Sequence, residues 1–301
     1  MRKSCSSKKQ TSSIIRLYFK IVLSSRIDMS FNNQELKIWV LQAVVNLQKA
    51  VHEQKETAVA LSEFIQITSF LPITKLERWE AWLRSPLHCL RRFSLQKTVQ
   101  SNWPPFTNSS NISPWLDLCS GNGFKREEVL IGIKSDAPNA FLFALVLRRL
   151  NDWVPAVCDA ARRQVPIIAT QTRPEYVVDA LWGILSHLSS WGRISKQELE
   201  VLLNLLYLPD IAPLISKRIQ ERPAGPVASI MSQIGRISVL DNDLFDIAEN
   251  AIQPAVRAKA YRYLLEKKVV WLEGRRWQWS DQYFRDGKYK AVLGTRVVMH
   301  K

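Results

Sequence analysis

Few side chains in this sequence stand at spacings that would support catalysis. His88 and Cys89 are adjacent, and a thiol beside an imidazole is the pairing used in cysteine-based nucleophilic catalysis. Neighbouring residues on a helix or a strand do not face each other, however, and no orienting Asn or Asp pattern accompanies the pair. We therefore interpret His88 and Cys89 as ordinary structural residues.

Two short motifs resemble ligand-binding loops but lack essential positions. The run from Asp241 to Asp243 looks like the opening of a calcium loop, but the Gly at position six and the terminal Glu are missing, so we expect these residues to cap helices. The glycines of Ser120–Gly123 resemble a phosphate-binding loop, but no Gly-Lys-Ser/Thr follows them, so we interpret this motif as a turn. The four cysteines form no CxxC pair, and we expect them to be reduced, in a cytoplasmic protein without metal or cofactor.

The most distinctive segment is the basic and aromatic C-terminus. Residues 257–301 hold 12 Lys and Arg against 4 Asp and Glu, and the run from Arg275 to Trp279 is the densest part. Cations neutralise phosphates and aromatic rings stack on bases, so this mixture is typical of a nucleic-acid or other partner contact. The alternative is that the rings are core residues with cations outside, Trp277 and Trp279 alternating as on a strand or hairpin. The candidate contact residues are Arg257, Lys259, Arg262, Lys267, Lys268, Arg275, Arg276, Trp277 and Trp279.

The positive charge lies at the two ends of the chain. The whole sequence of 301 residues has a formal net charge of +15. Residues 1–28 hold 7 basic residues and 1 acidic residue, so the stretch 29–256 is close to neutral. The high pI of 9.8 therefore describes the ends and not the central part of the chain.

The composition and the periodicity predict a helical protein. Only 10 residues are Gly, which disfavours dinucleotide folds, phosphate loops and β-rich sandwiches. Apolar residues at helical spacing begin at Asn33, and we expect further helices over Thr57–Phe70 and Thr74–Arg84, ending before Pro72 and Pro86. Residues 98–123, with three prolines and many Ser and Asn, read as a long loop or linker.

Beyond this linker the predicted helices become regular. Their expected starts lie near residues 138, 153, 174, 195, 212, 225, 243 and 254, and the steps from 138 to 174, from 174 to 212 and from 212 to 254 are 36, 38 and 42 residues. The run Phe141–Leu147 is apolar all round, which fits a helix covered on both sides or a buried strand. Pro155–Val165 and Pro254–Leu264 share five of eleven residues, which indicates an internal repeat.

This part of the chain resembles HEAT repeats, in which the second helix of a pair often reads Asp-x₄-Val-Arg-x-x-Ala. Asp152, Val157 and Ala161 match this pattern, but Cys158 stands where Arg is usual. In the later copy Val256, Arg257 and Ala260 match, and Ala251 replaces the Asp. The resemblance implies a short right-handed α-solenoid of antiparallel helix pairs over about residues 124–270, and it implies no particular activity.

We expect five regions in the chain. They are a basic extension over 1–28, a helical segment over 29–97, the linker over 98–123, the repeats over 124–270 and a basic aromatic segment over 271–301. The extension would be absent if Met29 were the true start. We expect the last segment to include a small β-hairpin, and its end reads as truncated. No run is apolar enough to span a membrane. We predict a non-enzymatic scaffold that binds a protein partner; the alternative is a nucleic-acid-binding HEAT-like protein, as some DNA-repair glycosylases are. The sequence does not fix the oligomeric state.

Overall fold

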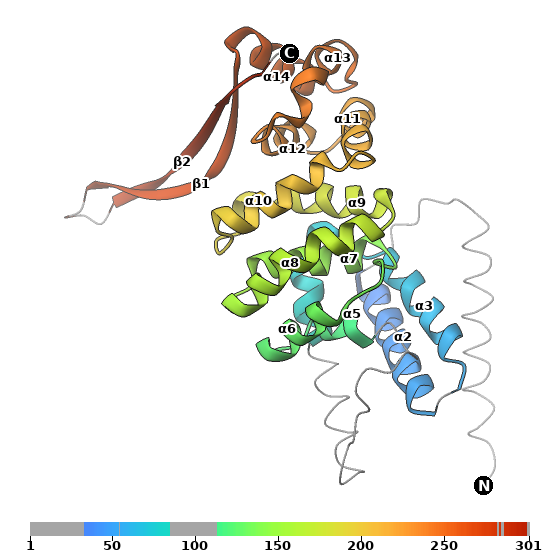
Figure 1. Ribbon diagram of the computed structural model, residues 1–301. Helices are drawn as coiled ribbons and strands as arrows, with labels where there is room; N and C mark the ends of the chain where they lie inside the picture. Colours follow the sequence, from blue (N-terminus) through green and yellow to red (C-terminus); the bar gives the residue numbers. More distant parts are fainter. Residues whose placement is uncertain (1–32, 54, 85–112, 282, 284–285, 300–301) are drawn as a thin grey trace.

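The protein is mostly helical and carries a two-stranded antiparallel hairpin near its C-terminus, as the sequence predicted. The structure is a computed structural model that describes residues 33–53, 55–84, 113–281, 283 and 286–299. Figure 1 shows the helices stacked into an elongated body, from which the hairpin projects beside α12 and α14. The predicted basic extension and the pair His88–Cys89 lie outside the described residues.

The N-terminal helices form where the apolar spacing placed them. Helix α2 (Asn33–Glu53) packs against α3 (Thr57–Ser69), and a 3₁₀ turn (Ile73–Lys75) leads into a helix over 76–84. Val40, Val44 and Phe64 are fully buried because they lie on the facing sides of α2 and α3. Helix α3 ends before Pro72, since proline cannot continue a helix interior, and the chain bends by 85° into the next helix.

Part of the predicted linker is ordered structure. Residues 98–112 lie outside the described residues, but Ser113–Asp117 form a short helix, α5, and α6 (Gly123–Gly132) begins directly after a turn. Trp115 and Leu118 are buried, which anchors this stretch to the body. The Asn122 side chain accepts a hydrogen bond from the Phe124 amide, so the Ser120–Gly123 motif is a turn that ends in a helix cap.

The helices that follow begin within two residues of each predicted start. They are α7 (Ala140–Arg148), α8 (Pro155–Gln171), α9 (Pro174–Leu185), α10 (Lys196–Asn204), α11 (Ile211–Glu221), α12 (Val227–Ile234), α13 (Leu244–Asn250) and α14 (Pro254–Glu266). Proline occupies the first turn of α8, α9 and α14, where its missing N–H costs little. Ser195 and Glu198 form a capping box at the start of α10.

Alternate helices of the body pack against one another. Helix α6 contacts α8 and α8 contacts α10, while α7 contacts α9, α9 contacts α11 and α11 contacts α13. Figure 1 shows these helices following one another along the body. Helix α7 has neighbours on several sides, and its residues Phe141–Leu147 are all buried, so this apolar run is a helix and not a strand.

A buried ionic network joins the helix over 76–84 to α6 and to the segment that precedes α8. Asp152 accepts hydrogen bonds from Arg126 on α6 (2.6 and 3.0 Å) and from Arg149 (2.7 Å), and Arg149 also reaches Glu80 at 2.5 Å. Burial raises the pKa of the Asp152 carboxyl, but the Arg126 hydrogen bonds and the Arg149 charge outweigh it, so that this pKa lies below its usual value. The HEAT pattern would have an Arg at position 158, where this chain has Cys158. Here Arg126 and Arg149 supply the cations that pair with Asp152.

In the described ranges, no single helix has the length and apolarity to cross a bilayer, and two helix pairs, each bent by 85° at its break, reach those limits only when both members are counted together.

Candidate functional site

The hairpin places the candidate residues on two faces. Strand β1 (Lys268–Asp281) pairs with β2 (Asp286–Val297) in a register that sets Trp277 opposite Tyr289 and Arg276 opposite Lys290. Because side chains alternate across a strand, Trp277, Trp279 and Tyr289 share one face, and Arg276 and Lys290 share the other. The predicted alternation of the two tryptophans is therefore real.

The three rings form an exposed aromatic cluster. The Trp277 ring centroid lies 5.5 Å from that of Trp279 and 4.9 Å from that of Tyr289, with edge-to-face geometry in both pairs. Trp277 is 40% exposed, Trp279 48% and Tyr289 66%. A Cβ on Gly287 would lie 2.6 Å from the Trp277 ring, so the glycine lets this ring lie flat across β2. The rings are thus fixed relative to one another and open to a ligand.

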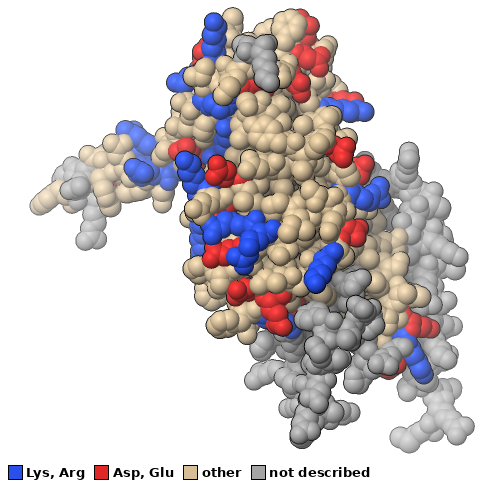
Figure 2. All heavy atoms as spheres, in the orientation of Figure 1, with Lys and Arg blue, Asp and Glu red and all other residues tan. Residues whose placement is uncertain are grey.

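Four exposed cations lie on the same hairpin as this aromatic cluster, one of them on the aromatic face. Arg275 lies on the aromatic face, and Arg276, Lys288 and Lys290 lie on the opposite face, all four exposed. None of the four forms an ion pair with a residue that the structure describes. Figure 2 shows Lys and Arg side chains gathered on the hairpin and along the adjoining edge of the helical body. These charges are therefore available to an anionic partner.

Specific contacts fix the base of the hairpin to the body. Arg296 on β2 binds the Asp241 carboxylate through two N–H groups, at 2.6 and 2.7 Å, and donates to the carbonyl of Gly235 at 3.0 Å. The Met299 amide also donates to Asp241. Neither Asp241 nor Asp243 caps a helix with its side chain, so that prediction was wrong: Asp241 anchors the hairpin instead.

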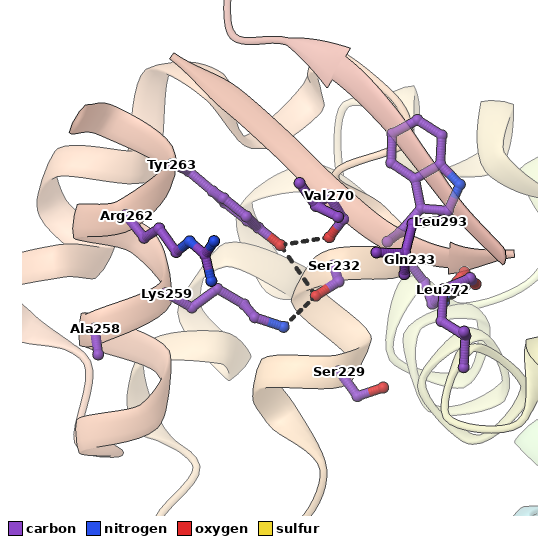
Figure 3. Close-up of a pocket in the computed structure, with 11 residues that line it drawn as sticks. Ser229, Ser232, Gln233, Ala258, Lys259, Arg262, Tyr263, Val270, Leu272 and Leu293 are labelled. Carbon is purple, nitrogen blue, oxygen red and sulfur yellow. Dashed lines mark hydrogen bonds between the residues drawn. The ribbon is translucent and has the colours of Figure 1, made fainter. Parts of the chain in front are cut away.

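A pocket of about 590 Å³ lies where α12, α14 and β1 meet (Figure 3). The single O–H of Tyr263 lies within hydrogen-bonding distance of two acceptors, the Val270 carbonyl at 2.9 Å and Ser232 Oγ at 3.0 Å. Lys259 also donates to Ser232 Oγ, and to the Ala228 carbonyl at 2.9 Å. Burial raises the pKa of the Tyr263 phenol, so Tyr263 remains a donor in this pocket.

The nine predicted contact residues divide into three groups. Arg275, Arg276, Trp277 and Trp279 come together on the hairpin, as described above. Lys259 and Arg262 line the pocket.

The other three candidates have structural places. Arg257 donates to the carbonyls of Ala251 and Ile252 at the end of α13, Lys267 ends α14 in the left-handed conformation (φ 50°), and Lys268 begins β1.

The sequence interpretation left three hairpin residues out of the site. Tyr289, Lys288 and Lys290 belong to it because the register sets them opposite or beside the tryptophans. The Asp286-Gly287 dipeptide is typical of a two-residue turn, but it lies at the start of β2 and pairs with Asp281 and Trp279, so it could not have given this register.

Among the described residues no group of three or more His, Cys, Asp and Glu side chains is placed to hold a metal ion. Of the described cysteines, Cys119 and Cys158 are free thiols, and burial raises the pKa of Cys119 to about 12.

Comparison of the chain with protein-family models, curated proteins and solved structures gives no match.

Proposed function

We propose that this protein binds nucleic acid against its C-terminal hairpin and has no catalytic activity of its own. The observation that carries the proposal is the combination of an exposed aromatic cluster with four cations that have no acidic partner among the described residues. Aromatic faces stack on unpaired bases irrespective of sequence, and Arg and Lys neutralise the neighbouring phosphates. A single strand is therefore the form of nucleic acid that fits the site best.

The helical body would serve as the scaffold that holds the hairpin in place. We propose that it is a short right-handed α-solenoid of HEAT type, in which neighbouring helix pairs share their apolar sides. The contacts between alternate helices and the prolines that begin α8 and α14 at matching positions support this arrangement. The bidentate Arg296–Asp241 pair would transmit this rigidity to the hairpin.

The test is the affinity for a labelled single-stranded 20-mer, measured by fluorescence anisotropy at several salt concentrations. Four phosphate contacts give a slope of log K against log salt of about −2.8 on a single strand, or a loss of roughly fiftyfold between 50 and 200 mM. Replacing Trp277 by Ala should cost about 1–3 kcal/mol of binding energy, because one stacked base is lost.

A matched control is available on the body. Trp153 is 64% exposed but lies far from the hairpin in sequence, just before α8, so Trp153→Ala should leave the affinity unchanged. Arg275→Gln with Arg276→Gln should flatten the salt slope by about 1.4, whereas Lys217→Gln on α11 should not. An affinity for the single strand that does not change with salt concentration, or that W153A and W277A weaken equally, would contradict the proposal.

The second candidate partner is a protein bound by the helical body. Phe124 and Trp153 are 84% and 64% exposed, and the start of α6 lies close to the segment before α8, since a Cβ on Gly123 would lie 2.8 Å from Val154. Large exposed apolar side chains at one place are typical of protein interfaces. A host protein retained by the wild type and by W277A, but lost from a Phe124→Ser/Trp153→Ser variant in mild salt, would favour this candidate. A cytoplasmic location stays a prediction.

A further inference from the structure

The pocket at the base of the hairpin has one polar side and one apolar side. Ser229 and Ser232 on α12 and Lys259, Arg262 and Tyr263 on α14 form the polar side. Facing them are apolar residues of the hairpin: Val270, Trp271, Leu272 and Leu293. Figure 3 shows Lys259 and Arg262 projecting from the same side of α14. A pocket of this size and mixed lining suits a small molecule with one charged end.

The charged end must be negative. Lys259 and Arg262 line the pocket, and no Asp or Glu does. An ammonium group has three N–H donors, and Lys259 uses two of them on Ala228 and Ser232, which leaves one for a ligand. Burial, and after it the neighbouring Arg262 charge, lower the pKa of Lys259. Arg262 forms an ion pair with Glu266 through one N–H at 2.7 Å, and its other N–H groups have no hydrogen-bond partner among the described residues, so they can contact a ligand.

We propose that this pocket binds a phosphate monoester carried on a planar or apolar body, of about the size of a nucleoside monophosphate. A phosphate monoester has nearly two negative charges and three acceptor oxygens near neutral pH. The two cations and the Ser229 hydroxyl supply hydrogen-bond donors for these phosphate oxygens. A carboxylate, with one charge and two oxygens, would use only some of these donors. The body of the ligand would lie against Leu272 and Leu293.

Two sources can supply this phosphate. One is a free mononucleotide. The other is the terminal phosphate of a strand held by the hairpin, because Leu293 stands on the same face of β2 as Tyr289, four residues away, so that the pocket and the aromatic cluster share one hairpin face. The second source rests on the proposed function, and the first does not.

The experiment is isothermal titration calorimetry of the full chain with AMP and with adenosine. AMP should bind, and adenosine, which lacks the phosphate, should bind about tenfold more weakly or worse, since charge-assisted hydrogen bonds are lost. Arg262→Gln and Lys259→Gln should each weaken AMP binding about tenfold. Lys267→Gln, a neighbouring cation outside the pocket lining, should change it less than about twofold. Arg262 is exposed, so R262Q keeps the test valid even if K259Q disturbs folding.

Equal affinities for AMP and adenosine, or no AMP binding at millimolar concentration, would overturn the proposal. The source is decided by hexanucleotides with and without a terminal phosphate. Tighter binding of the phosphorylated strand, lost in R262Q, assigns the strand end; equal binding, with AMP still bound, assigns a free nucleotide. If no oligonucleotide binds at all, the hairpin proposal fails, and the AMP titration still decides the pocket.

Discussion

Replacing Asp152 with Asn removes the charge that two buried guanidinium groups share. The Asp152 and Arg126 side chains are each only 1% exposed, and the Arg149 side chain 4%. Asn keeps the size of the side chain but accepts hydrogen bonds at one oxygen instead of two, and it cannot neutralise either cation. The variant therefore tests whether this network, which joins the helix over 76–84 to α6 and to the segment before α8, stabilises the fold.

The expected loss of folding stability is about 3 kcal/mol, at the low end of the range of about 3–5 kcal/mol for breaking a buried ion pair. The low end applies because each cation retains a second partner: Arg126 donates to the Ser120 carbonyl at 2.7 Å, and Arg149 reaches Glu80. Asp159 pairs with Arg162 near the surface, where the Asp159 side chain is 48% exposed. Asp159→Asn is thus the matched control and should cost less than about 1 kcal/mol.

Urea unfolding followed by circular dichroism measures both variants. With a slope of about 3 kcal/mol/M, Asp152→Asn should lower the midpoint by about 1 M and Asp159→Asn by less than about 0.3 M. Because the folded-state pKa of Asp152 is lowered, its contribution is present above pH 3.8 and is lost as the pH falls through the folded-state pKa. The difference between wild type and D152N should therefore narrow in strong acid. Equal midpoint shifts for the two variants would refute the reasoning.

Three further predictions concern the hairpin and its pocket. Asp241→Asn should release the base of the hairpin, seen as faster proteolytic cleavage within β1 and β2 with unchanged helical circular dichroism; unchanged cleavage would contradict the anchor. Gly287→Val should displace the Trp277 ring and weaken strand binding about as much as W277A, whereas Gly274→Val, whose Cβ would meet nothing within 4 Å, should not. The folded-state pKa of Lys259 is lowered, so the wild type should gain stability as the pH rises toward 10.5. In thermal unfolding between pH 7 and pH 10, Lys259→Gln should lack this gain. Identical pH dependence of the two proteins would contradict the burial of a charged Lys259.

The sequence predicted the helix starts because local chemistry decides them. Pro174 and Pro254 stand in the first turn of their helices, and Ser195 caps its helix with Glu198 three residues on. The hairpin was also within reach, since Trp277 and Trp279 alternate. The apolar run Phe141–Leu147 was ambiguous because a fully buried helix has no polar face, and only its neighbours settle it.

Long-range charge pairing could not be read in the same way. Asp152 and Arg126 are 26 residues apart, and Arg296 lies 55 residues from Asp241, so neither pair follows from periodicity. Lys259 illustrates the same limit for the site. Its charge marked it as a surface contact, whereas packing of α14 against α12 turns it into the pocket beside Ser232.

The most direct measurement of the central claim is ultraviolet crosslinking of a single-stranded oligonucleotide to the full chain, with the crosslinked peptides identified by mass spectrometry. If the hairpin holds the strand, the crosslinks lie on Trp277, Trp279 and Tyr289 and disappear at high salt. Crosslinks confined to the helices of the body, or none on the hairpin at low salt, would contradict the account.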